Sequence, residues 1–195
     1  MIGKYTVEIE NAFLKYKFEI KRNITIIKGN SATGKTTLID MLDLYYNDKN
    51  AGVNLKCEKD CVVLSGRNWQ HDLEIIDDSI VFIDEQNRFI KSKEFAATIL
   101  KTNNYYVIIT REKLSNLPYS INEIYGIRES GRYLRLGREF TENELYNIYG
   151  LNPSGSFKAE FVISEDSNSG YDFWNTYYEC KCEYSSGNAN LLNKV

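Results

Sequence analysis

The chain begins with two segments in which apolar and polar residues alternate, KYTVEIE and LKYKFEI, joined by the short turn NAF. Three later segments are apolar almost throughout: NITIIKG, SIVFIDE and NYYVIITRE. Alternation is typical of a strand with one solvated face, and a continuous apolar run is typical of a strand buried on both faces. The sequence therefore predicts an N-terminal antiparallel β-meander followed by buried strands.

Segments with helical spacing separate these strands. TTLIDMLDLYY carries Leu38, Leu42 and Tyr45 on one side, and SKEFAATILKT begins at Ser92, a suitable N-cap residue. A further helix is expected at TENELYNIYG with a Thr141 cap, and the alternating runs around ESGR predict a hairpin. Strands that alternate with helices predict an α/β fold with a mostly parallel sheet flanked by helices.

A change of composition divides the chain near its C-terminal end. LNPSGSFKA is rich in Gly, Ser and Pro, which is typical of a linker. Beyond it, EFVISED, GYDFWNTYY and CKCEYSS predict a strand, a helix and a strand. We therefore expect a first domain at residues 1–150, a linker at 151–158 and a small β-α-β piece at 159–195.

Composition and charge are those of an ordinary globular protein. Apolar residues make up 43% of the 195 residues and charged residues 26%, and the net charge of −3 disfavours a wholly basic nucleic-acid-binding surface. No apolar run approaches the roughly 18 residues of a membrane helix, so we expect a cytoplasmic protein with no membrane partner. Neither Cys57 and Cys61 nor Cys180 and Cys182 have the spacing of zinc ligands, and all four are expected to be reduced, packed thiols.

A phosphate-binding pattern, G-x-x-x-x-G-K-[ST], follows the first buried strand and opens a helix. Gly29 and Gly34 allow backbone turns that aim N–H groups at a phosphate. Lys35 places a cation on the β and γ oxygens, and the Thr36 hydroxyl can ligate Mg²⁺. The residues predicted to bind the nucleotide are Gly29, Asn30, Ser31, Ala32, Thr33, Gly34, Lys35, Thr36 and Thr37.

Two carboxylates end the strand IVFIDE. Asp84 is placed at the carboxyl end of this strand, beside the phosphate loop in an open parallel sheet, and is the second predicted Mg²⁺ ligand with Thr36. Glu85 comes next and can polarise the attacking water as a general base. Lys35 and Glu85 are therefore predicted catalytic residues.

Together, GNSATGKT, IVFIDE and YYVIITRE resemble the P-loop ATPases that insert an additional strand between the first strand and the Walker-B strand and carry a glutamate after the Walker-B aspartate. The resemblance covers roughly residues 1–140. The meander is similar to that of ABC-type and overcoming-lysogenization-defect (OLD) ATPases, but the segment between Lys35 and Asp84 is too short for an ABC helical subdomain. The compact spacing looks more like zonula-occludens-toxin and AAA-type ATPases. The resemblance implies a P-loop NTPase fold, ATP and Mg²⁺ as cofactors, a homo-oligomer or partner protein, and DNA by family analogy alone.

The resemblance also implies roles for single residues. Thr110 becomes a third catalytic residue, a sensor of the γ-phosphate or water, and Arg111 either acts on a neighbouring subunit's nucleotide or forms a surface salt bridge. Phe13 or Tyr16 stacks on adenine. The C-terminal piece is similar to the start of a TOPRIM-like domain, which maps a metal-binding glutamate to Glu165, but the D-x-D carboxylates of that site are not in this sequence.

The function expected from these residues is a Mg²⁺-dependent ATP-hydrolysing switch or motor, and the resemblance implies a mobile-element or phage-defence system. A small nucleotide or metabolite kinase is one alternative, although such kinases often lack a carboxylate like Glu85 and usually carry an arginine-rich lid. A nucleotide-binding regulator without turnover is the other. No N-K-x-D motif follows a strand, which favours ATP over GTP.

Overall fold

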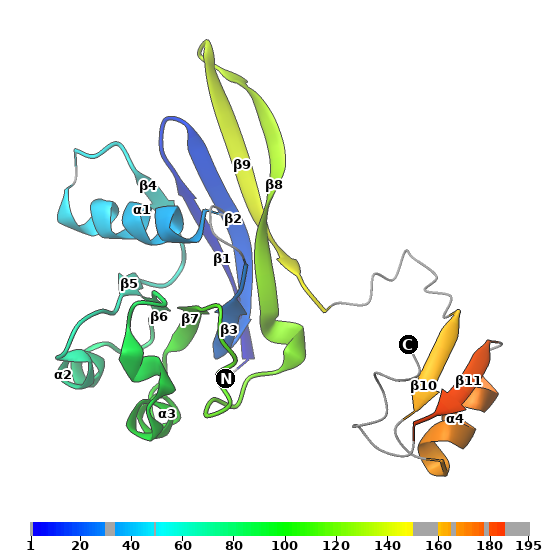
Figure 1. Ribbon diagram of the computed structural model, residues 1–195. Coiled ribbons are helices and arrows are strands. Elements are labelled where there is room, and N and C mark those ends of the chain that lie inside the picture. The colour runs from blue at the N-terminus through cyan, green and yellow to red at the C-terminus, as the bar shows by residue number, and fades with distance from the viewer. Residues whose placement is uncertain are drawn as a thin grey trace. The chain divides into compact units, whose positions relative to one another are not determined.

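The chain forms two units, Met1–Gly150 and Leu151–Val195, each with a sheet of its own (Figure 1). The computed structural model describes residues 2–29, 34–48, 50–149, 160–164, 167–177 and 180–185. Within these residues, no helix is long and apolar enough to cross a membrane.

The first unit is built on one mixed sheet. Its strands are β1 Ile2–Glu10, β2 Leu14–Arg22, β3 Ile24–Ile27, β4 Asn54–Lys56, β5 Cys61–Val63, β6 Ile80–Ile83, β7 Tyr105–Ile109, β8 Ile124–Arg135 and β9 Arg138–Asn147. Within the described part of the chain they lie side by side in the order β4-β1-β2-β9-β8-β3-β7-β6-β5.

A parallel section occupies one end of this sheet. β3 pairs with β7, β7 with β6 and β6 with β5, all in the same direction. Every residue of β3, β6 and β7 is buried, as their continuous apolar runs predict. Ile109 lies opposite Ile27 and Ile108 opposite Ile83, so these three strands end at the same edge.

The other section is antiparallel and overturns the expected fold class. The ladders β1–β2, β1–β4 and β8–β9 are antiparallel and together hold more residue pairs than the parallel ladders. The prediction of a mostly parallel α/β sheet of P-loop NTPase type is therefore wrong. The molecule has a mixed sheet in which a long antiparallel hairpin continues beyond the parallel strands.

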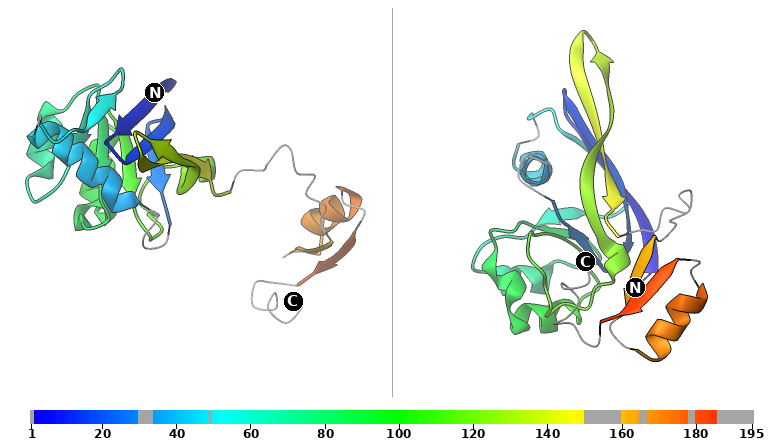
Figure 2. Two further views of the ribbon diagram at one scale, coloured as in Figure 1. Left: turned by 90° about the horizontal axis from the view of Figure 1, so that it is seen from above. Right: turned by 45° about the vertical axis from the view of Figure 1, so that its right-hand side comes forward.

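A hairpin was expected here, but its second strand, β9, continues through a segment where a helix was expected. Residues 141–147 belong to β9, and Thr141 pairs with Leu14 of β2 on one side and with Arg132 of β8 on the other. Bonding to two neighbours outweighs the local helical signal of TENELYN. The turn lies at residues 136–137 rather than at ESGR, and β8 and β9 extend as a projecting ribbon (Figure 2).

Helices cover both faces of the parallel section. They are α1 Lys35–Asn47, α2 Trp69–Ile75 and α3 Lys93–Ile99, with 3₁₀ turns η1 Arg88–Lys91 and η2 Ile121–Glu123. Leu38 and Leu42 of α1 pack with Phe82 in one core, and Trp69 and Phe95 of α2 and α3 pack in the other. The predicted Ser92 cap is confirmed, because Ser92 Oγ accepts from the Phe95 N–H at 3.0 Å.

The second unit is a β-α-β arrangement. Its elements are β10 Phe161–Ser164, α4 Ser169–Tyr177 and β11 Lys181–Tyr184. β10 and β11 pair in parallel, and the rings of Tyr171 and Tyr184 join the helix to the sheet with centroids 5.5 Å apart. Residues 150–159, which include the predicted linker, and Glu165 lie outside the described residues.

Candidate phosphate-binding site

Three predicted site segments meet at the edge where β3, β6 and β7 end. Gly29 lies just after β3, Asp84 directly after β6 and Thr110 directly after β7. The Thr110 N–H donates to the carbonyl oxygen of Ile27 at 3.1 Å, which holds the ends of β3 and β7 together. Backbone and side-chain groups from three separate parts of the sequence can therefore act on one ligand.

Lys35 joins the two sides of the predicted phosphate loop. It is the first residue of α1, and its Nζ donates to the carbonyl oxygen of Gly29 at 2.9 Å. Only 5% of the residue is exposed. Burial lowers the pKa of this ammonium group, the charge of Arg111 lowers it further, and Glu85 and Asp84 act in the opposite direction. An anionic ligand here would supply the negative charge that this buried cation favours.

Gly34 is held in place by a residue from β2. Its φ is +82°, and the Tyr16 hydroxyl donates to its carbonyl oxygen at 2.7 Å. A Cβ at Gly34 would lie 2.6 Å from the Tyr16 hydroxyl oxygen, so both conformation and space demand glycine. Burial raises the pKa of Tyr16 to about 12, and its hydrogen bonding with Thr37 opposes this shift.

The buried position of Tyr16 corrects one sequence expectation. Only 1% of the residue is exposed, so its ring is not available to stack on adenine. Phe13 is 53% exposed, and the Arg138 guanidinium lies 5.7 Å from its ring centroid. An adenine-stacking role for Phe13 stays a prediction.

Asp84 and Glu85 form a turn that orients both carboxylates. Asp84 Oδ1 accepts from the Glu85 N–H at 2.8 Å, and Asn87 Nδ2 donates to the Asp84 carbonyl oxygen at 3.1 Å. Glu85 Oε1 pairs with Arg111 Nη2 at 3.1 Å. Arg111 thus makes a salt bridge within the chain, to the carboxylate predicted as general base.

Thr110 is 2% exposed, and its Oγ1 accepts from the Glu112 N–H at 3.1 Å. This bond fixes the direction of the hydroxyl oxygen and leaves its hydrogen to be donated. The geometry therefore allows one donated bond from Thr110 to a ligand oxygen or water.

The structure describes most of the predicted site residues. Thr36 and Thr37 lie on the exposed side of the first turn of α1, and Asn30, Ser31, Ala32 and Thr33 lie outside the described residues. No group of three or more His, Cys, Asp or Glu side chains in the described residues can hold a metal by itself. The Thr36 hydroxyl and the Asp84 carboxylate do fit Mg²⁺ that shares phosphate oxygens and water as its other ligands.

No protein-family model, curated protein or solved structure matches this chain.

The sequence pointed to Tyr16 only as a possible adenine-stacking residue and did not reveal its contact with Gly34, and it did not reveal Asn87 at all. Tyr16 precedes Gly34 by 18 positions in an alternating strand, where an aromatic residue normally signals core. Asn87 also accepts from the Gly66 N–H at 3.1 Å, which ties the turn after β6 to the loop after β5. Both contacts depend on which strands become neighbours.

Proposed function

We propose that this chain binds ATP with Mg²⁺ at residues 29–37 and hydrolyses it, acting as a nucleotide-dependent switch. The observation that carries the proposal is the position of Lys35, whose buried ammonium group reaches across the loop to the carbonyl oxygen of Gly29. The charges of Glu85 and Asp84 act to raise the pKa of this group, against the effect of burial. The local strand order supports it, since β7 lies between β3 and β6 as the resemblance to additional-strand ATPases implies.

Each residue has a distinct part in this proposal. Lys35 exchanges its bond to the Gly29 carbonyl for phosphate oxygens, beside the positive end of α1. Glu85 takes a proton from the attacking water while the water oxygen bonds to the γ-phosphorus and the bridging oxygen leaves with ADP. Thr36 and Asp84 would hold Mg²⁺, which supplies charge neutralisation at the phosphates.

The Glu85–Arg111 ion pair provides the switch. In this geometry Arg111 holds the carboxylate that must face water, so the arginine has to move toward the phosphates before Glu85 is released. Negative charge on a bound γ-phosphate favours that movement. The switch works in the cytoplasm and acts on a second copy of the chain or on another protein.

Phosphate release from Mg-ATP at increasing protein concentration tests this function. Glu85→Gln should bind ATP but release almost no phosphate, and Lys35→Ala should lose binding. Lys93→Ala is the matched control, because Lys93 is also the first residue of a helix but is exposed and lies on α3. Failure of the unaltered chain to bind ATP would refute the proposal.

The same ion pair favours a second candidate, a nucleotide-binding regulator without turnover. If Arg111 keeps Glu85 from water even with ATP bound, the native chain binds but does not hydrolyse. Arg111→Ala separates the two functions, because turnover that appears only in this variant indicates the regulator. Binding without release in either protein calls for a screen of phosphoryl acceptors.

A further inference from the structure

Leu136 occupies an unusual position at the end of the β8–β9 hairpin. It is 98% exposed and has a φ of +52°, and Gly137 after it has a φ of +74°. Two-residue turns with positive φ at both positions favour Asn, Asp or Gly first, and a leucine there is strained. Neither local structure nor packing among the described residues explains a leucine at this position.

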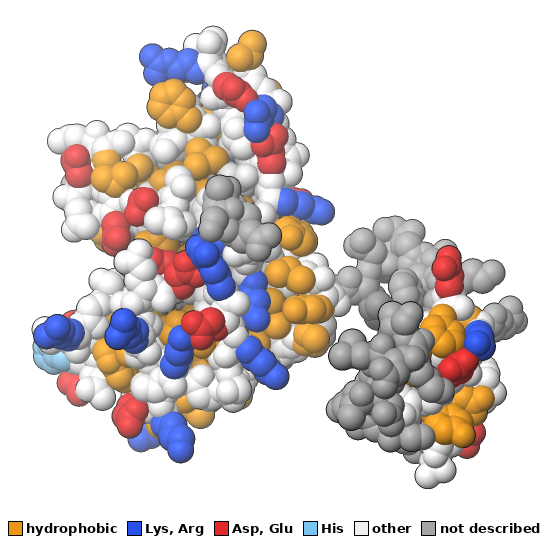
Figure 3. Space-filling view, viewed as in Figure 1, with side chains coloured by type: hydrophobic (Ala, Val, Ile, Leu, Met, Phe, Trp, Pro, Cys, Tyr) orange, Lys and Arg blue, Asp and Glu red, His pale blue; other side chains and the backbone are white. Residues whose placement is uncertain are grey.

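Other large side chains near the turn are exposed as well. Leu134 is 76% exposed, and Phe13, from the turn between β1 and β2, is 53% exposed. Arg135 and Arg138 flank the turn in paired register. The strand register places Leu134 on the opposite face of the ribbon from Arg135 and Arg138. We call the group on the face of the two arginines the hairpin-tip surface, and its residues are Phe13, Arg135, Leu136 and Arg138. At the upper end of Figure 3, apolar and basic side chains lie beside one another.

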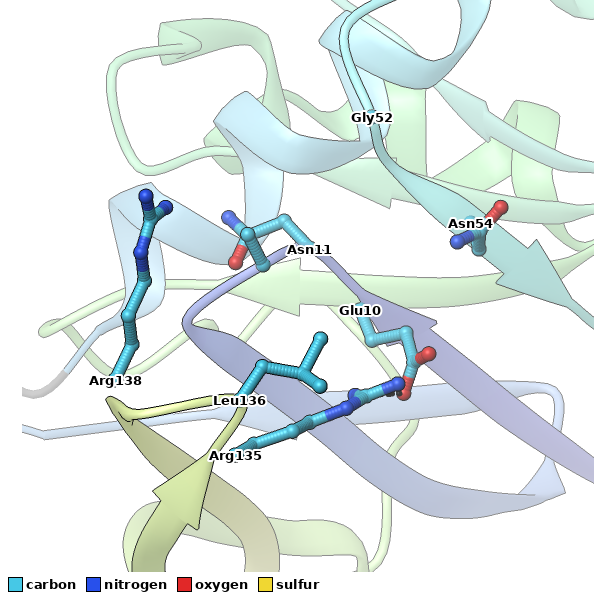
Figure 4. A pocket seen from close by; sticks show the side chains of 8 residues that line it. Glu10, Asn11, Gly52, Asn54, Arg135, Leu136 and Arg138 are labelled. Carbon is cyan, nitrogen blue, oxygen red and sulfur yellow. Dashed lines mark ion pairs between the residues drawn. The ribbon is translucent and has the colours of Figure 1, made fainter.

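A cavity of about 460 Å³ lies beside Leu136 (Figure 4). Arg135 points toward Glu10 across it, with 3.6 Å between Nη1 and Oε2. Asn11 and Asn54 add amide groups to the lining. Among the described residues Arg138 has no acidic partner, so the surface carries an unpaired cation next to a loosely held carboxylate.

We propose that the hairpin-tip surface binds the same surface of a second copy of this chain. In a two-fold interface the same patch of each copy faces the other. The patch must therefore contain both the projecting side chain and the cavity that receives it. Leu136 of each copy enters the cavity of the other, and Arg138 of each reaches Glu10 of the other. The patch is small compared with a standard interface, so the association is weak and reversible.

The charges favour a second copy over a polyanion. Arg132 is paired with Glu129 at 2.6 Å and with Glu139 at 2.9 Å, and Arg135 is paired with Glu10. Nucleic acids and anionic membranes bind surfaces that offer several unpaired basic side chains. On the face shown in Figure 3, Lys and Arg side chains are interspersed with Asp and Glu.

Sedimentation equilibrium of the full chain without nucleotide tests the interface, independently of any ATP binding. Leu136→Asn should weaken dimerisation about tenfold or more, the loss expected for a buried apolar anchor. The same change creates an Asn-Gly turn, so its melting temperature should stay equal or rise, which excludes unfolding as the cause. Leu100→Asn, at a leucine that is 60% exposed after α3, is the control and should dimerise normally.

Charge reversal tests the predicted pairing. Arg138→Glu alone and Glu10→Arg alone should each remain monomeric, because like charges face each other across the two-fold axis. Mixing the two variants should restore association, since each then offers the opposite charge to the other. A native chain that stays monomeric at high micromolar concentration overturns the proposal. So does a mixture that does not associate, or a monomer that binds DNA or anionic vesicles through Leu136.

Discussion

The Tyr16 hydroxyl donates a hydrogen bond to the carbonyl oxygen of Gly34 at 2.7 Å and thereby links β2 to the start of α1. Lys35 makes the corresponding contact at the other side of the loop, on the carbonyl oxygen of Gly29. The two ends of the predicted phosphate loop are therefore fixed by separate bonds. Such preorganisation keeps a buried cation ready for an anionic ligand.

Substitution of Gly34 should disturb the loop in two ways. Gly34→Ala places a Cβ 2.6 Å from the Tyr16 hydroxyl oxygen and forces an L-residue to a φ of +82°. We expect the free energy of unfolding to fall by about 2 kcal/mol and ATP binding to weaken about tenfold. Urea denaturation and nucleotide titration measure the two effects.

Gly66→Ala is the matched control for this prediction. Gly66 has a φ of +87°, but a Cβ there would meet nothing within 4 Å. The control therefore isolates backbone strain from the clash with Tyr16. Equal losses of stability in both variants would show that the Tyr16 contact does not constrain Gly34.

The free energy of unfolding should fall at alkaline pH because of the buried Tyr16 hydroxyl. Its pKa is about 12 in the folded chain, while an unfolded tyrosine ionises near pH 10. Because the folded pKa is the higher one, the stabilisation from neutral Tyr16 is complete below about pH 10 and is lost as the pH rises toward 12. Tyr16→Phe has no hydroxyl to ionise at this position, so its free energy of unfolding should decline less steeply across that pH interval. Parallel slopes for both proteins would contradict the prediction.

Local pattern predicted the buried strands well because their residues are apolar in any context. β3, β6 and β7 have only buried positions, and their apolar runs sufficed to place Asp84 and Thr110 at strand ends. The contacts that depend on which strands become neighbours, such as the bond from Tyr16 to Gly34, carried no local signal. The positions of these residues at strand ends were therefore easier to predict than the contacts that hold them.

The global sheet could not be predicted in the same way. TENELYN has capping and helical features, yet Thr141 pairs on both sides because β2 and β8 are adjacent to it in the folded chain. Leu136 gave no turn signal, since leucine is disfavoured at positive φ. Pairing with β2, which is distant in the sequence, decided that this segment became a strand, and with it the mixed character of the sheet.

Removal of Mg²⁺ should separate the proposed roles of Asp84 and Glu85. EDTA should weaken ATP binding by the native chain about tenfold, because the phosphates lose their shared ion. Asp84→Asn should show much less dependence on Mg²⁺, while Glu85→Gln should keep it. The thermal shift produced by ATP with Mg²⁺ or EDTA measures this without turnover. An Asp84→Asn variant with the full native Mg²⁺ response would exclude Asp84 as a ligand.

Thr25, in β3, and Thr110, after β7, are buried threonines with opposite hydrogen-bonding states. Thr25 is 0% exposed, and its Oγ1 has no partner among the described residues, whereas Thr110 Oγ1 accepts from the Glu112 N–H at 3.1 Å. Thr25→Val replaces an unsatisfied hydroxyl by a methyl group of similar size, so the free energy of unfolding should rise by about 1 kcal/mol. Thr110→Val removes a made bond and should lower it by about the same amount. Urea denaturation of the two variants gives both signs, and a loss of stability in Thr25→Val would mean that this hydroxyl has a partner, such as a bound water.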